Sequence, residues 1–210
     1  MFLAMATVES DRRTQEERRA TTRAALLDAA IECLVEHGYA GTTTGRVCER
    51  AGLSRGAIGH HFHTRADMVV EALRELARRR AGEMIGEAER LPPGSERVER
   101  ALDLLWTWFN GPLFHAAVDV AVAARTDPEL RTTLESIERE LGRETLRCCR
   151  GMFAAAEADA SNDQLIQMSL AAIRGLALLP VLQPGSQRRA DKQWAFARER
   201  LAELFAVATP

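Results

Sequence analysis

Residues 53–63 read LSRGAIGHHFH and bring one hydroxyl, one guanidinium and three imidazoles within ten positions. The side chains of Ser54, Arg55 and the histidines can all donate hydrogen bonds to anionic oxygens, and a guanidinium can hold a phosphate through two parallel bonds. The stretch also contains Gly56 and Gly59. Each glycine costs a helix about 0.5 to 1 kcal/mol relative to alanine, so a bare backbone must be useful at these two positions.

Helical spacing gives each of these side chains a direction. Ile58 and Phe62 lie at i and i+4 and therefore share one face, which we expect to point into a core. An outward glycine lets a helix backbone come close to another surface, such as the edges of base pairs, and exposed imidazoles can donate to phosphates or base edges. The opposite face gathers Gly56, Gly59, His60 and His63.

A metal site is the first alternative for the histidines. His60 and His61 are adjacent, so on a helix they point about 100° apart, and no nearby cysteine completes a tetrahedral set. We therefore predict no metal site and no cofactor. A redox sensor that uses Cys148 and Cys149 is a second alternative, but neighbouring cysteines rarely form a disulfide, and Cys148 lies on an apolar stripe where a small core residue is expected.

Catalytic motifs do not stand out in the chain. It contains no glycine-rich phosphate loop after a strand and no H-E-x-x-H. We therefore do not expect an enzyme, although a helical enzyme without DNA contact remains an alternative.

Composition is that of an ordinary globular protein, with 210 residues, 46% hydrophobic, 28% charged and a net charge of −2. The charge is uneven, because residues 1–80 hold 13 arginines against 11 acidic residues while the remainder is acidic. Any nucleic acid should therefore contact residues 1–80.

The cysteines lack C-x-x-C spacing, no export signal is seen, and the apolar run from Leu170 is too short to cross a bilayer. A reduced cytoplasmic setting without membrane contact is expected.

The elements that position these groups are predicted to be helices throughout. Residues 1–13 lack periodicity and suggest a flexible arm, whereas Thr14 and Glu17 form a capping box that opens a helix over about 15–37. Further start and stop signals predict two short helices that begin at Thr43 or Thr44 and at Ser54, a longer helix that begins at Thr64, and five more over about 95–109, 113–125, 128–157, 162–182 and 188–208. The fold class is all-α with about nine helices.

The two short helices are joined by Ala51, Gly52 and Leu53 and have the dimensions of a helix-turn-helix, whose second helix enters the major groove. The segment GYAGTTTGRVCERAGLSRGAIGHHFHTRADMV resembles the DNA-binding signature of the TetR family of bacterial regulators over roughly residues 20–75. The family commonly has tyrosine at the position of Gly59, so this chain lacks one phosphate contact there. The resemblance implies that Thr44, Ser54, Arg55, His60, His61 and Arg65 contact the DNA backbone and that Gly56 and Ala57 approach bases.

The resemblance also implies the remaining organisation. Residues 14–63 form a three-helix DNA-binding domain, and residues 64–210 form a helical domain for ligand binding and dimerisation. A homodimer through the last two helices would bind a palindromic double-stranded operator, as a repressor released by a small-molecule effector. The arginines at positions 12, 13, 18 and 19 either extend into the minor groove or belong to a solvated helix start, because Glu16 and Glu17 are interleaved.

Two charges stand inside apolar helices, Asp119 and Arg174, and neither should be buried alone. They either form a salt bridge with each other or across a subunit interface, or they anchor a ligand in a cavity. The walls of such a cavity would be Trp106, Phe109, Phe114 and His115.

Overall fold

The computed structural model describes residues 2–94, 96–153 and 160–208. Over these residues every regular element is a helix, which confirms the predicted all-α class. The ten helices are α1 (Phe2–Gly41), α2 (Thr44–Ala51), α3 (Arg55–Gly59), α4 (Arg65–Ala88), α5 (Glu96–Phe109), α6 (Pro112–Ala124), α7 (Pro128–Met152), α8 (Ala160–Ala177), α9 (Leu179–Leu182) and α10 (Gln187–Ala208).

Local side-chain chemistry sets the start of three helices, α2, α4 and α7, as the sequence predicts. The Thr43 hydroxyl accepts a hydrogen bond at the start of α2, and Gly52 ends that helix with a left-handed φ of 66°. Thr64 and Asp67 form a reciprocal capping box at α4. The Asp127 carboxylate accepts from a backbone N–H at the start of α7. These caps satisfy backbone donors that a helix end would otherwise leave unpaired.

The start of α1 differs from the expectation. The helix begins at Phe2 rather than near residue 15, so residues 2–13 of the predicted flexible arm lie within it, while residue 1 is outside the described residues. The physical reason is that no glycine or proline precedes Gly38 in the sequence, and the helix can pass through the predicted capping box. Gly38 has φ 64° and ψ −174°, which breaks α1 at the predicted end of the first helix.

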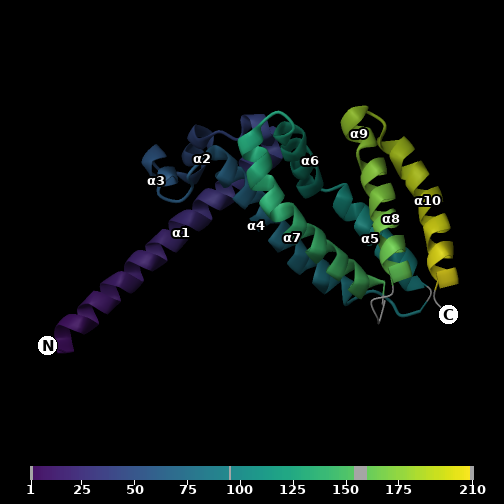
Figure 1. Cartoon of the computed structure of the whole chain (residues 1–210), viewed down its shortest axis with the longest axis horizontal. Helices are drawn as coiled ribbons and strands as arrows, with labels where there is room; N and C mark the ends of the chain where they lie inside the picture. The colour runs from purple at the N-terminus through teal and green to yellow at the C-terminus, as the bar shows by residue number, and fades with distance from the viewer. Residues whose placement is uncertain (1, 95, 154–159, 209–210) are drawn as a thin grey trace.

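Figure 1 shows how the helices are arranged. The amino-terminal half of α1 projects from the body, and α2 and α3 lie beside the other end of α1. The long helices α4 and α7 run side by side with their carboxyl ends together, while α8 and α10 form a pair at the far side of the molecule. The helix-turn-helix and the α8–α10 pair therefore occupy opposite ends of the body.

The buried side chains form two clusters. The first joins α1 to α4 with α6 and the first half of α7, and includes Leu26, Val47, Met68 and Ile137. The second joins α5, the end of α7, α8 and α10, and includes Leu102, Met152, Ile173 and Trp194. Because the first cluster extends past residue 63, the three DNA-binding helices share one core with α4, α6 and α7.

An apolar face of the α8–α10 pair stays uncovered. The span Asn162–Leu182 is long and apolar enough to cross a membrane, by length and composition only, and 28% of that span is buried. The sequence predicts an apolar run in this region that is too short to cross a bilayer, so the length of the span differs from that expectation. The buried core helix of a protein outside the membrane can meet the same criteria of length and composition. The uncovered large side chains of this pair and of α9 are Met168, Val181, Leu182, Phe196, Leu204 and Val207.

Candidate nucleic-acid interface

The inward face of α3 is buried as predicted. Ile58 is 6% exposed and Phe62 is 4% exposed, and both belong to the first core cluster. Helix α3 itself ends at Gly59, so Phe62 lies in the turn that follows it rather than in the helix. Burial of these two apolar side chains, each contributing about 1.5 to 3 kcal/mol, fixes which way the rest of α3 points.

The outward face of α3 is almost without side chains near its centre. A Cβ atom placed on Gly56 would meet only the Ser54 Oγ, at 3.9 Å, and one placed on Gly59 would meet nothing within 4 Å. Neither glycine has a positive φ. Neither packing nor backbone conformation therefore requires glycine here. His60 and His63 are exposed beside this ridge, which we call the reader ridge: Gly56, Gly59, His60 and His63.

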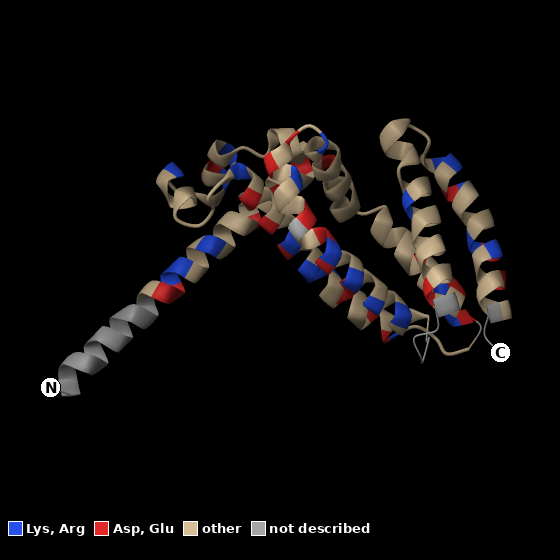
Figure 2. Cartoon of the chain, in the orientation of Figure 1, with Lys and Arg blue, Asp and Glu red and all other residues tan. Residues whose placement is uncertain are grey.

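Polar groups stand at the start of α3. Ser54 is exposed at the N-cap position, and its side chain makes no capping hydrogen bond, so its hydroxyl is available to another partner. Arg55 is exposed, and its guanidinium would lie 3.3 Å from a Cβ on Gly45 of α2. Thr44 is exposed at the first position of α2. These groups surround one surface, and Figure 2 shows that α1, α2 and α3 each carry basic side chains.

Arg65 has an internal role that its sequence position did not reveal. Its Nε donates to the Thr42 carbonyl oxygen at 2.8 Å, a second nitrogen donates to the Tyr39 carbonyl oxygen, and the guanidinium lies 4.0 Å from the Tyr39 ring centroid. From the start of α4, the Arg65 guanidinium therefore holds the end of α1 and the turn that leads to α2. Ala57 is half-buried, whereas the predicted neighbours Ser54 and Gly56 are exposed.

The same turn is held from the other side by two carboxylates. The Tyr39 N–H donates to Asp119 of α6, and the Tyr39 hydroxyl donates to Asp127 at 3.1 Å. A Cβ atom on Gly38 would lie 2.5 Å from Asp119 Oδ2. Asp119 therefore joins α6 to the DNA-binding helices, and the salt bridge considered between Asp119 and Arg174 is not the arrangement found.

The other predicted ligand residues are also divided. Trp106 stacks on Trp194 of α10 with centroids 5.1 Å apart. Phe109 meets Phe114 edge-on at 5.2 Å, and the Arg174 guanidinium lies 5.2 Å from the Phe109 centroid. His115 is exposed beside Phe114, at 6.3 Å between ring centroids. Phe109, Phe114, His115 and Arg174 thus form one corner where α5, α6 and α8 meet, and Asp119 lies outside it.

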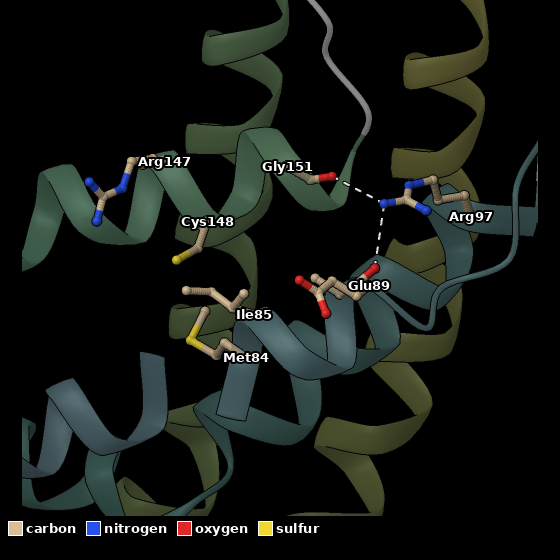
Figure 3. A pocket seen from close by; sticks show the side chains of 8 residues that line it. Met84, Ile85, Glu89, Arg97, Arg147, Cys148 and Gly151 are labelled. Atoms are coloured by element: carbon tan, nitrogen blue, oxygen red, sulfur yellow. Dashed lines mark hydrogen bonds between the residues drawn. The ribbon is translucent and has the colours of Figure 1, made fainter. Parts of the chain in front are cut away.

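A groove that sequence reasoning missed lies between the carboxyl ends of α4 and α7 (Figure 3). It encloses about 250 Å³, and Met84, Ile85 and Cys148 contribute to its walls. Arg97 spans the rim and donates to carbonyl oxygens at both helix ends, including those of Ala88, Leu91, Gly151 and Met152. Nothing in the sequence signalled the groove, because its apolar residues read as an ordinary helix face.

The two adjacent cysteines differ from the prediction. Cys149, not Cys148, is the fully buried residue, while Cys148 is half-buried at the groove. On a 3.6-residue period Cys148 keeps the direction of Ile137 and Leu141, whereas Cys149 lies about 100° further around the helix. Cys149 is buried because the end of α7 packs into the second core cluster, against α5 and α8. Burial raises the pKa of the Cys149 thiol to about 12 and also raises that of Cys148. Neither is activated as a thiolate, so the structure does not favour a redox switch here.

We expect thiol reagents to separate these cysteines. In the native protein at neutral pH, a disulfide reagent should modify one thiol per chain, Cys148, more slowly than free cysteine, because the other three thiols are buried. Measurement of released chromophore with time, repeated after denaturation, gives the count. Replacement Cys148→Ser should abolish the native reaction, and fast modification of two or more thiols would contradict this assignment.

Comparisons with known proteins agree with this geometry. The family model described as "Bacterial regulatory proteins, tetR family" matches residues 26–72, which include the whole helix-turn-helix. The regulator CymR of Pseudomonas putida is 30% identical over 200 residues, which cover 92% of this chain and 97% of CymR. The chain belongs to the TetR family. This membership rests on a match over nearly the full length of both proteins.

Other relatives match over less of their length. An uncharacterized HTH-type transcriptional regulator of Mycobacterium tuberculosis, Rv2912c, is 34% identical over 125 residues, and the match spans 60% of this chain and 64% of that protein. The transcriptional repressor AcnR of Corynebacterium glutamicum is 32% identical over 118 residues, which cover 55% of this chain and 57% of AcnR.

Solved structures of TetR-type regulators share the fold. A TetR transcription regulator from Haloarcula marismortui superposes with a TM-score of 0.67 at 18% identity, covering 90% of this chain and 98% of that one. A regulator from Saccharomonospora viridis, solved in complex with choline, gives a TM-score of 0.63 at 17% identity over 89% and 96% of the two chains. The chain therefore shares with the family its helical arrangement in addition to its sequence signature.

Proposed function

We propose that the protein is a DNA-binding transcriptional repressor that binds a palindromic operator as a homodimer and is released by a small-molecule effector. The observation that carries the proposal is the reader ridge, where two glycines that neither packing nor backbone requires face outward beside exposed imidazoles. In this proposal residues 14–63 read DNA and residues 64–210 bind the effector and a second subunit. DNA as the partner implies a cytoplasmic location in a bacterium.

The uncovered face of α8 and α10 supports the dimer. Met168 and Phe196 are 44% and 67% exposed, and large exposed apolar patches usually mark interaction surfaces. A two-fold axis that pairs these helices with their copies would bury both faces in a four-helix interface. The two reader ridges would then lie about 34 Å apart, one turn of DNA, and would match two half-sites of a palindrome.

Release by an effector requires a difference in affinity between two conformations. To lower operator occupancy tenfold, the effector must favour the released state by about 1.4 kcal/mol. Two places are candidates for its binding: the aromatic corner with Phe109 and Arg174, and the groove with Met84 and Cys148. Both adjoin helices of the 64–210 unit, and α4 extends from the groove to the DNA-binding helices. The choline complex of a similar fold supports a small-molecule ligand.

Selection of DNA fragments with the purified protein, followed by footprinting, tests the proposal directly. We expect one protected palindrome whose half-site centres are about ten base pairs apart. Binding without any protected palindrome, or no binding to any selected fragment, would contradict the regulator function. The genes next to the selected fragments would then suggest which compounds to test as effectors.

Salt dependence gives a quantitative prediction. With about four phosphate contacts per subunit, the slope of log K against log salt concentration should be near −7 for the dimer. Arg55→Ala should weaken binding to all sequences by about tenfold or more and reduce the slope by about one per subunit. Arg100→Ala, which removes an exposed residue of α5, is the matched control and should leave both values unchanged. A slope near zero would contradict phosphate binding by this surface.

A further inference from the structure

The groove between the carboxyl ends of α4 and α7 has walls that are almost entirely apolar. Figure 3 shows Met84 and Ile85 of α4 pointing toward Cys148 of α7 across the groove. Ile85 is 50% exposed, so the described part of the chain leaves half of this large apolar residue uncovered. Uncovered apolar surface favours an apolar occupant, because burial lowers the free energy in proportion to the area removed from water.

The charged groups at the groove give little to a charged ligand. Arg97 donates to four backbone carbonyl oxygens at or just after the carboxyl ends of both helices, at 2.8 to 3.5 Å, so most of its donors are already used. Arg147 lies 3.9 Å from Glu144 and 76% of its side chain is exposed, and Glu89 is exposed as well. Ion pairs with such solvated side chains contribute little, whereas a charge that enters the apolar part loses its hydration. The groove therefore favours an uncharged ligand.

Two sulfur atoms stand in the walls of the groove. Figure 3 places the Met84 thioether on the α4 side and the Cys148 thiol on the α7 side. Burial raises the pKa of the Cys148 thiol, so this wall is uncharged at neutral pH. Sulfur atoms make favourable contacts with aromatic rings at about 5 Å. An aromatic ring therefore suits these walls better than an aliphatic group of the same size.

The volume of the groove limits the size of its ligand. The groove encloses about 250 Å³. At roughly 30 Å³ for each heavy atom, which is the share of one water in the liquid, this space holds about eight heavy atoms. A benzene ring that carries a short alkyl group has this size.

We propose that this groove is the effector site and that it binds a small uncharged aromatic molecule of the size and chemistry of an alkylbenzene. The inference rests on the proposed repressor function, for which it names the class of effector and selects the groove over the aromatic corner. One wall belongs to α4, whose other end joins α1 in the first core cluster through Met68 and Val69. An occupant that separates α4 from α7 therefore also shifts the support of the DNA-binding helices.

The test uses ethylbenzene as the probe and the Cys148 thiol as the reporter. The rate at which a disulfide reagent modifies the native protein is measured at increasing ethylbenzene concentration, up to its solubility limit. Because the bound molecule covers the thiol, we expect the rate to fall by about threefold or more and to approach a plateau. Phenylacetate and 2-phenylethylamine are similar in size but carry a negative and a positive charge, and they should need about tenfold higher concentrations.

Variants at exposed apolar side chains locate the site. Ile85→Ser removes part of one wall and should weaken ethylbenzene binding by about tenfold. Val122→Ser makes a similar change at an exposed valine of α6 outside the groove, so it is the matched control and should bind ethylbenzene as the native protein does. Met84→Leu keeps the wall apolar but removes its sulfur, and it should weaken binding by about threefold.

Titration of selected operator DNA with and without ethylbenzene then tests the effector role. Ethylbenzene should lower operator affinity for the native protein and for Val122→Ser, and should do so at about tenfold higher concentration for Ile85→Ser. No protection of Cys148 up to the solubility limit, equal protection by the charged compounds, or unchanged binding by Met84→Leu would overturn the proposed ligand, while operator binding without ligand stays intact. Protection of Cys148 without any loss of operator affinity would overturn the effector role of the groove. No operator binding in the absence of ligand would overturn the proposed repressor function itself.

Discussion

Valine in place of Gly56 is expected to weaken operator binding by about a hundredfold while the protein keeps its fold. The added branched side chain projects from the reader ridge and would hold α3 away from the base edges, removing about 3 kcal/mol of contacts. Folding should be retained because a Cβ at Gly56 meets only the Ser54 Oγ, at 3.9 Å. Affinity is measured by titration with selected operator DNA, and the fold by circular dichroism and thermal unfolding.

Two companion variants make this result specific. Gly142 lies in α7, away from α3, and a Cβ added there would meet nothing within 4 Å. Gly142→Val therefore makes the same substitution outside α3 and should leave DNA affinity unchanged. Gly56→Ala adds one methyl group and should give a smaller loss than valine. Normal operator binding by the Gly56→Val protein would refute the close approach of the α3 backbone to DNA, even if other residues still contact phosphates.

Alanine in place of Gly38 is expected to lower the free energy of unfolding by about 4 kcal/mol. The φ of 64° and ψ of −174° lie in a region that is essentially restricted to glycine, and the strain costs about 2 kcal/mol. The new Cβ would also lie 2.5 Å from Asp119 Oδ2, forcing the carboxylate away from the Tyr39 N–H, at a cost of about 2 kcal/mol. Denaturant unfolding measures the total, and the midpoint temperature should fall by about 10 °C.

A double-mutant comparison separates the two parts of this effect. In an Asp119→Ala background the carboxylate is already absent, so Gly38→Ala should cost only the backbone strain, about 2 kcal/mol. Gly52→Ala offers a control, because Gly52 also has a positive φ, of 66°, but nothing lies within 4 Å of its Cβ position. Equal losses for Gly38→Ala with and without Asp119 would show that α6 does not hold this turn.

Much of the DNA-binding unit could be predicted because its signals are local. Thr43, Thr64 and Asp127 begin helices through hydrogen bonds to backbone groups within three residues, and Gly52 ends one through its own φ. The direction of α3 followed from Ile58 and Phe62 for the same reason, since helical periodicity relates neighbours in the chain. Functional expectations for the exposed face then followed from residue types together with the family resemblance.

The contacts that the sequence did not reveal join distant parts of the chain. Asp119 was grouped with aromatic residues of α5 and α6, yet it accepts a hydrogen bond from Tyr39, 80 positions away. Arg65 resembles a phosphate-binding residue in sequence, but its guanidinium donates to carbonyls of the turn between α1 and α2. No local pattern distinguishes a charge that turns inward from one that stays in solvent.

The helical class, the caps and the bare outward face of α3 follow from the order of the amino acids alone, because each depends on interactions within one or two turns of helix. The packing of separate helices was needed to establish that α6 holds the DNA-binding helices through Asp119, that Cys149 rather than Cys148 enters the core, and that Arg23 of α1 lies over the Phe62 ring. Such packing is set by the summed shape and burial of many side chains rather than by any single one, so no short stretch of the chain contains it.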